Sequence, residues 1–133
     1  MSQALNQETV NDIAKLMMHR LIARMLARDP ALIDQARASL MAMASRYPGR
    51  SFVQDWDEIL RYPPRELRLI LASRDPKMRR LRLSSPFVTA EGIDFTAPAA
   101  RRRIRRAAKR VAARVGNDSR QFQSTRQETL NAG

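Results

Sequence analysis

Cysteine is absent from the 133-residue chain, and histidine occurs once, as His19. Without cysteine the chain can form no disulfide and no thiolate nucleophile, and a single histidine cannot supply the usual ligands of a transition metal. The four glycines form no phosphate-binding loop, and the sequence has no Gly-x-Ser-x-Gly, His-Glu-x-x-His or EF-hand spacing. We therefore predict a protein that is not an enzyme and that uses no metal and no other cofactor.

Aromatic residues and long apolar runs are also scarce. Aromatics make up 5% of the chain and apolar residues 44%, so the core must consist of Leu, Ile, Met and Ala, a composition that favours helices over sheets. No apolar run approaches the roughly 20 residues that cross a bilayer. The N-terminus has neither the basic nor the apolar region of a secretory signal. These absences predict a soluble, cytoplasmic, all-α protein with no membrane partner.

Five segments of the first 83 residues carry helical signals. The first places Val10, Ile13, Met17, Leu21 and Met25 at spacings of three and four, which is the period of a buried helix face. This apolar stripe is widened by Leu16, Met18, Ile22 and Leu26. Proline and glycine mark most of the breaks between the segments. The prediction is a small bundle of five short helices over residues 7–28, 30–47, 52–62, 64–73 and 77–83, with the first two antiparallel.

Several of these helices have predicted start signals. The Asp-Pro steps at 29–30 and 75–76 supply an N-cap followed by a favourable first helical residue. Ser51 and Gln54 have the spacing of a capping box at the start of the third helix. On that helix, Trp56 is predicted to be a core anchor, with Asp55 and Glu58 beside it pairing with nearby arginines. Leu81 and Leu83 are predicted to be buried in the fifth helix.

The remaining third of the chain changes character. Residues 84–98 have no helical period, so they predict an extended loop or a small hairpin around Glu91 and Gly92. A last helix is predicted to start near Thr96 and Pro98 and to end at Gly116. The chain is then organised as a helical body (1–97), an Arg-rich amphipathic helix (98–116) and a disordered tail (117–133).

Positive charge is concentrated in this last part. The whole chain has 25 Lys and Arg against 13 Asp and Glu, and residues 101–133 alone hold 10 of these cations and two of the carboxylates. On a helical wheel Ile104 lies among alanines and valines, and the other half is cationic. Eight cations and no carboxylate lie on this helix: Arg101, Arg102, Arg103, Arg105, Arg106, Lys109, Arg110 and Arg114.

Three interpretations of the cationic helix stay open at this point. The first interpretation is a solvated face in an Arg-biased proteome. The second is an element that binds DNA or RNA, and the third is a contact for an acidic protein surface. Because like charges repel along the helix, we expect it to be ordered by docking its Ala/Val stripe or by meeting a polyanion. The apolar face lacks the large side chains that a membrane-surface helix inserts.

Other charged and polar residues give weaker signals. A secondary basic cluster comprises Lys77, Arg79, Arg80 and Arg82, and we interpret it first as exposed arginines that flank buried leucines. The segment that follows, Ser84, Ser85, Pro86 and Phe87, is a candidate contact for a partner protein. His19 lacks a second histidine or an activated nucleophile nearby in the sequence, so we interpret it as a surface or packing residue.

Two stretches resemble a known class of proteins. His19-Arg-Leu-Ile-Ala and residues 27–37 form the first, and Trp56-Asp-Glu-Ile-Leu with residues 79–87 form the second. Over residues 15–90 they resemble small helical bacterial antitoxins of toxin–antitoxin modules. The resemblance implies a protein that binds and silences a toxin and regulates transcription of its own operon. The Arg-rich helix lies outside the resembling part.

The sequence therefore predicts a non-catalytic bacterial protein, antitoxin-like, whose body binds a partner protein and whose Arg-rich helix binds nucleic acid or another polyanion. Two alternatives remain: a nucleic-acid-binding (DNA-binding) regulator without a toxin partner, and a structural subunit of a larger assembly.

Overall fold

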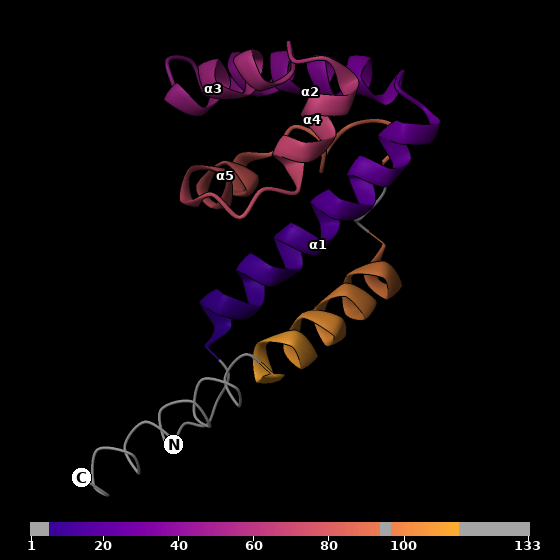
Figure 1. Cartoon of the computed structure of the whole chain (residues 1–133). Coiled ribbons are helices and arrows are strands. Elements are labelled where there is room, and N and C mark those ends of the chain that lie inside the picture. Colours follow the sequence, from indigo (N-terminus) through magenta and orange to yellow (C-terminus); the bar gives the residue numbers. More distant parts are fainter. Residues whose placement is uncertain (1–5, 94–96, 115–133) are drawn as a thin grey trace, which may run out of the picture.

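The chain folds into helices, as seen in a computed structural model that describes residues 6–93 and 97–114 (Figure 1). Short turns join the helices of residues 7–84. No strand occurs in these residues, so the predicted all-α class is confirmed. Thr96, Gly116 and the predicted tail 117–133 lie outside the described residues. The helices are α1 (Gln7–Arg28), α2 (Leu32–Arg46), α3 (Ser51–Ile59), α4 (Pro64–Leu71), α5 (Pro76–Leu81), the 3-10 helix η1 (Arg82–Ser84) and residues 98–114, which we call the basic helix.

The long helix α1 is the centre of the arrangement. Its main helical partner is α4, which lies against its C-terminal half, whereas the basic helix lies beside its N-terminal half (Figure 1). The second helix, α2, does not fold back along α1 as an antiparallel partner but packs mainly on α3. Together α2 and α3 form a layer across one end of α1 (Figure 1).

The predicted apolar stripe of α1 packs against two different partners. Met18, Ile22 and Leu26 face the main core, whereas Leu21 is 38% exposed. The residues nearer the N-terminus of the predicted stripe, Val10 and its neighbours, pack instead against the basic helix. Sequence periodicity marked both faces as one because both are apolar, but they cover different partners.

Trp56 is the predicted core anchor, and its burial is confirmed. It is fully buried on α3, and its Nε1 donates a hydrogen bond of 3.0 Å to the Leu81 carbonyl. This bond satisfies the indole N–H in the core and ties α3 to the end of α5. Phe87 approaches it edge to face, with ring centroids 6.2 Å apart.

The predicted helix starts are partly confirmed. Asp75 is the N-cap of α5, and its Oδ1 accepts from the Lys77 amide at 2.9 Å. The capping box at Ser51 is wrong, because Arg50 is the N-cap and no side chain caps the helix. Asp29 likewise does not cap α2, which begins at Leu32 after a turn. The Asp29 amide instead closes α1 by donating to the Met25 carbonyl.

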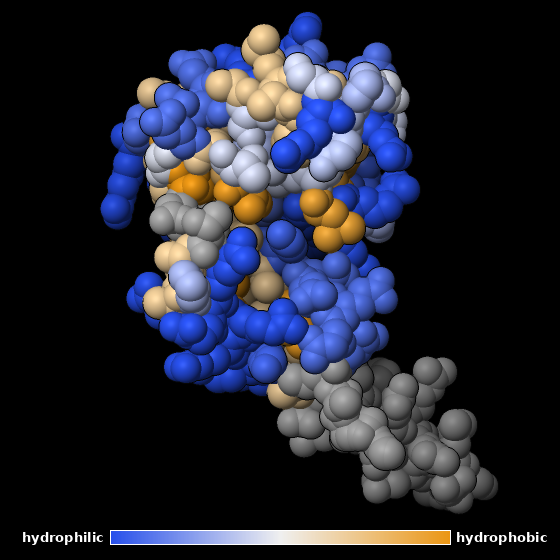
Figure 2. Space-filling model, turned by 180° about the vertical axis from the view of Figure 1, so that it is seen from behind, coloured by the Kyte–Doolittle hydropathy of each residue, from blue (hydrophilic) through white to orange (hydrophobic). Residues whose placement is uncertain are grey.

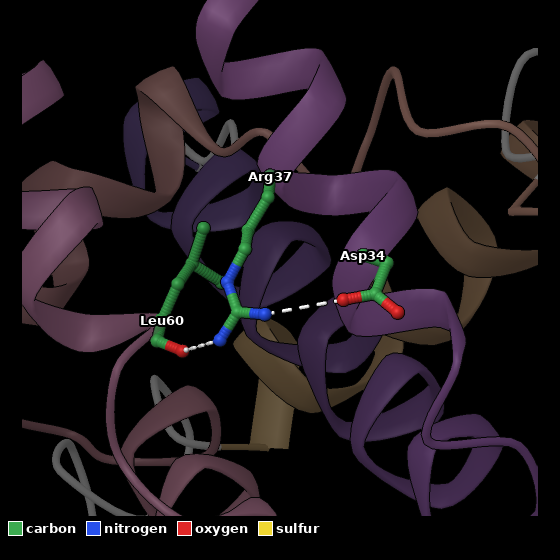
Figure 3. A network of polar contacts seen from close by, with 3 residues as sticks. All are labelled: Asp34, Arg37 and Leu60. Carbon is green, nitrogen blue, oxygen red and sulfur yellow. Dashed lines mark hydrogen bonds and ion pairs between the residues drawn. The ribbon is translucent and has the colours of Figure 1, made fainter.

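A partly buried polar contact holds α2 to the end of α3. Arg37 of α2 donates through Nη2 to the Leu60 carbonyl at 2.9 Å and through Nη1 to Asp34 at 3.1 Å (Figure 3). The backbone bond satisfies a carbonyl at the C-terminus of α3, where a cation is also favoured by the helix dipole. The contact with Asp34 is exposed and contributes little by itself.

In its described part, the segment after η1 is a loop built of turns, not the small hairpin that was the second predicted alternative. Its described part carries two turn bonds, from the Ala90 amide to the Phe87 carbonyl and from the Ile93 amide to the Ala90 carbonyl. Gly92 has φ +88, and a Cβ built there would lie 3.0 Å from Leu32 Cδ2. Only glycine fits this position without strain, because both the backbone conformation and the space disfavour a side chain.

Candidate functional site

The basic helix is held on α1 by a narrow apolar seam. Ala108 and Ala112 are buried against Val10, with Ala14 and Met17 packed beside them, and Ile104 reaches the main core. Small alanine side chains let the two helices approach closely. The expectation that this helix is ordered by docking its apolar stripe is therefore confirmed, with the exception of Val111, which is 37% exposed.

All eight cations of the basic helix are exposed at its surface: Arg101, Arg102, Arg103, Arg105, Arg106, Lys109, Arg110 and Arg114. Figure 2 shows hydrophilic surface gathered over the lower part of the molecule, where this helix and the start of α1 lie. Seven of them form no ion pair within the described residues: Arg102, Arg103, Arg105, Arg106, Lys109, Arg110 and Arg114. Docking thus presents these seven cations on the surface without a carboxylate partner among the described residues.

Arg105 differs from its neighbours because it is tied to α1. Its Nη1 donates to Asn11 Oδ1 at 3.0 Å, and its Nη2 donates to Gln7 Oε1. Both acceptors are neutral amides, so the contacts fix the guanidinium in place and leave its charge uncompensated. Arg105 therefore helps to position the basic helix as well as adding to its charge.

The secondary basic cluster is divided between two sides of α5. Lys77 lies 3.9 Å from Asp55 and, with Arg80, lines a hollow beside α3. Arg79 lies 3.8 Å from Asp12 of α1 on the other side. The four cations therefore do not form one surface for an anion.

Arg82 contradicts the expectation of exposed arginines flanking buried leucines. It is only 3% exposed, whereas its neighbour Leu83 is 67% exposed. The 3-10 helix η1 turns the chain at this point, so the positions that face inward no longer follow the α-helical period. The guanidinium donates through Nε and Nη2 to the Leu71 carbonyl, at 3.3 and 3.0 Å, and through Nη2 to the Ser73 carbonyl.

Most of the Ser84–Phe87 segment is core rather than surface. Ser85, Pro86 and Phe87 are buried, and Ser84 is half-buried with its hydroxyl donating to the Leu81 carbonyl at 3.1 Å. A partner protein would reach Ser85 and Phe87 only if the core opened.

His19 and Ser85 form a buried hydrogen-bonded pair that the sequence did not reveal. His19 Nδ1 lies 2.7 Å from the Lys15 carbonyl, and because a carbonyl only accepts, Nδ1 carries the proton. Nε2 then accepts from the Ser85 hydroxyl at 2.8 Å, and Ser85 Oγ in turn accepts from the Phe87 amide at 3.2 Å. The pKa of His19 is lowered to about 4, chiefly by burial and in smaller part by the charges of Arg82 and Lys15, while the hydrogen bond to the Lys15 carbonyl opposes this shift.

The spacing of this pair resembles that of a nucleophile and its base, but its setting differs. His19 is fully buried, with its ring stacked on Trp56 at 6.4 Å between centroids, and Ser85 is 5% exposed. A nucleophile must be reached by its substrate. We therefore assign the pair to the core, as the packing interpretation of His19 expects.

The described residues contain no group of three or more His, Asp or Glu side chains that could hold a metal ion. Among the described helices, none combines the length and the apolar composition needed to cross a membrane. No protein-family model, no curated protein and no solved structure matches the chain. Function must therefore be argued from the chain's own residues.

Proposed function

We propose that the protein is a non-catalytic binding protein whose basic helix binds nucleic acid through phosphate contacts. The observation that carries this proposal is the docked arrangement of the helix. Its apolar seam is used against α1, and its cations face outward, seven of them (all but Arg101) without a carboxylate partner among the described residues. Ordinary solvated helix faces mix both signs of charge, whereas this face has one sign.

Six cations of the basic helix are the best candidates for phosphate contact: Arg102, Arg103, Arg106, Lys109, Arg110 and Arg114. They are exposed and make no side-chain hydrogen bond or ion pair with other described residues, in contrast to Arg105. If all six reach phosphates of a DNA duplex, the logarithm of the binding constant should fall with the logarithm of salt concentration with a slope of about −5. Contacts to phosphates alone carry no base preference.

The test is a salt series with matched variants. Binding of the full chain to a labelled DNA duplex, and to a single-stranded RNA of the same sequence, is measured by fluorescence anisotropy between about 50 and 200 mM salt. The variant changes Arg102, Arg103, Arg106 and Arg110 to Gln, which should reduce the slope on the duplex to about −2 because two of the six contacts remain.

The matched control changes four exposed arginines of the body to Gln: Arg24, Arg46, Arg50 and Arg65. It loses the same net charge but keeps the basic helix, so its slope should stay near −5. An equal loss in both variants would show that only total charge matters and would contradict the assignment to this helix. Binding that does not weaken with salt would remove the proposal altogether.

The antitoxin role is a second part of the proposal, and it rests on the resembling residues. His19, Trp56 and Phe87 come from the two resembling stretches and meet in one buried cluster. The resemblance therefore concerns residues that build the body, and a toxin partner would bind the surface of that body. A DNA-binding basic helix would suit transcriptional control of the operon that encodes both proteins.

The antitoxin role is tested by its neighbouring reading frame. We expect overexpression of that neighbour alone to arrest growth and co-expression of this chain to restore it. Restoration should persist in the basic-helix variant if the body alone binds the toxin. A neighbour that does no harm would contradict the antitoxin role and leave a nucleic-acid-binding protein without a toxin partner.

A further inference from the structure

A cleft with an unusual lining lies along α1, between the basic helix and the segment from the end of α4 to η1. Its volume is about 330 Å³, and four arginines from four parts of the chain line it: Arg20 of α1, Arg74 after α4, Arg79 of α5 and Arg82 of η1. Asp12 is the one carboxylate in the lining. The formal charge of the lining is therefore strongly positive, although this region is separate from the exposed cations of the basic helix.

Arg82 gives the cleft a fixed cationic wall. Its Nε and Nη2 are held by the carbonyls of Leu71 and Ser73, which orients the guanidinium plane. Its Nη1 makes no hydrogen bond with the described residues, although Arg82 as a whole is 97% buried. Among the described residues, every fully buried side-chain nitrogen or oxygen has a hydrogen-bond partner. Because Nη1 has none, it is not fully buried and solvent reaches it. An oxyanion in the cleft would supply the acceptor that Nη1 lacks.

The other arginines are positioned to move toward such an anion. Arg20 and Arg74 are exposed and make no ion pair within the described chain, and Arg79 is held only by its long 3.8 Å contact with Asp12. Arg20 and Arg79 lie close enough to lower the pKa of Arg82 by repulsion, after the larger effect of burial. Bringing like charges together is unfavourable unless an anion lies between them.

The rest of the lining is apolar. Ile13, Leu16 and Met17 of α1 are half-buried there, and Val111 of the basic helix borders the cleft with its side chain partly exposed. An inorganic ion would leave this surface in contact with water. A volume near 330 Å³ is at the lower end of the range for small-molecule sites, which fits an anionic group with about one ring attached.

We propose that this cleft binds a phosphate monoester with an apolar organic part, the phosphate lying on the four arginines and the organic part lying on Leu16 and Val111. A phosphate dianion matches the charge of the lining better than a single carboxylate, and its oxygens suit the paired N–H groups of arginine. The proposal does not require the basic helix to bind nucleic acid, since the probe described next has no nucleic-acid backbone.

Phenyl phosphate is the probe, titrated into the full chain at low salt by calorimetry, with the protein's amide NMR signals followed in parallel. We expect one saturable site per chain and weaker binding of inorganic phosphate, which cannot use the apolar surface. Absence of saturation, or equal binding of the two anions, would overturn the proposal. Failure here would leave the salt dependence of nucleic-acid binding by the basic helix untouched.

Variants locate the binding. Arg74→Gln and Arg79→Gln should each weaken phenyl phosphate about tenfold, the usual cost of one charged hydrogen bond. Arg80→Gln is the matched control, because it removes the same charge from α5 but on the side that faces away from the cleft. Asp12→Asn should tighten binding several-fold by removing the one repulsive group, an effect that loss of folding cannot imitate.

Two further comparisons separate this cleft from the basic helix and identify the source of the ligand. Changing Arg102 and Arg103 to Gln should leave phenyl phosphate binding unchanged, and a loss of binding there would overturn the assignment. A 5′-phosphorylated oligonucleotide that binds more tightly than its 5′-hydroxyl counterpart, with the difference lost in Arg79→Gln, would indicate a nucleic-acid end as the source. Equal binding of the two oligonucleotides, with phenyl phosphate still saturating, would indicate a free phosphate monoester.

Discussion

The buried His19–Ser85 pair should make the stability of the protein depend on pH. In the folded chain the pKa of His19 is lowered to about 4 from the ordinary value of 6.5, chiefly by burial. Between these two pH values the unfolded chain binds a proton that the folded chain does not bind. The free energy of unfolding therefore falls as the pH is lowered from about 6.5 to about 4, and this contribution is fully present only above 6.5.

The size of the effect follows from the lowering of the pKa. Each unit of difference corresponds to about 1.4 kcal/mol, so His19 should account for a loss of about 3 kcal/mol between pH 7 and pH 4. This is a large share of the roughly 5–15 kcal/mol that stabilises a typical domain. The charged groups that face His19 add to the lowering, because Arg82 and Lys15 both disfavour a second positive charge.

The assay is urea unfolding at a series of pH values from about 4 to 7.5, followed by the fluorescence of Trp56, the only tryptophan. Because carboxylates also titrate near pH 4, the same series is measured for His19→Gln, and the difference between the two curves isolates the histidine. The free energy of unfolding of the original chain, minus that of His19→Gln, should rise by about 1.4 kcal/mol per pH unit between pH 4.5 and 6.

His19 is also the only histidine, so its ring protons give a single NMR signal to follow in the folded protein. We expect its midpoint near pH 4. A midpoint near 6.5 in the folded chain, or identical pH dependence of stability in His19→Gln, would refute the reasoning. Either result would mean that the imidazole is accessible to water and can be protonated where it lies.

Three other substitutions test the packing. Ala108→Glu places a carboxylate in the buried seam and should displace the basic helix, which would be seen as faster hydrogen exchange of α1 residues 10–17. The control is Ala113→Glu, because Ala113 is half-buried on the same helix and its replacement should change the exchange much less. Equal exchange in both variants would contradict the seam. Arg82→Lys should lower the free energy of unfolding by about 1–3 kcal/mol, because an ammonium cannot reproduce the planar contacts with Leu71 and Ser73. An unchanged midpoint of chemical denaturation would contradict those contacts. Gly92→Ala should be more destabilising than Gly49→Ala. Both glycines have positive φ, but only Gly92 faces a neighbour, Leu32. Equal losses of stability in the two variants would show that backbone strain alone matters.

Helix positions were the part that the sequence predicted best. Proline-marked breaks, such as Tyr62 followed by two prolines, are local steric effects, and the predicted bounds of α4 and α5 agree with the structure to within two residues at both ends. The capping box at Ser51 failed because Gly49 turns the chain with φ +78 and Arg50 takes the extended N-cap conformation, so Ser51 is already helical.

The arrangement of the sites was less predictable because it depends on contacts between distant parts of the chain. The exposure of the cationic face of the basic helix was expected from its wheel, and the described structure agrees. Arg20 and Arg74 gave no signal, since they join Arg82 only through the packing of α1 on α4. The pairing of His19 with Ser85 spans 66 residues, and no local pattern could have indicated it.

The alanine seam makes the basic helix and the first turns of α1 a single cooperative unit. Without residues 98–114, Val10 would lose its buried partners Ala108 and Ala112, so the body ending at residue 97 is not a thermodynamically independent piece. A polyanion bound on the outer face of the basic helix would relieve its charge repulsion and thereby favour the docked state. Occupancy of that outer face and folding of the N-terminal turns of α1 are then linked functions, each shifting the equilibrium of the other by the same free energy.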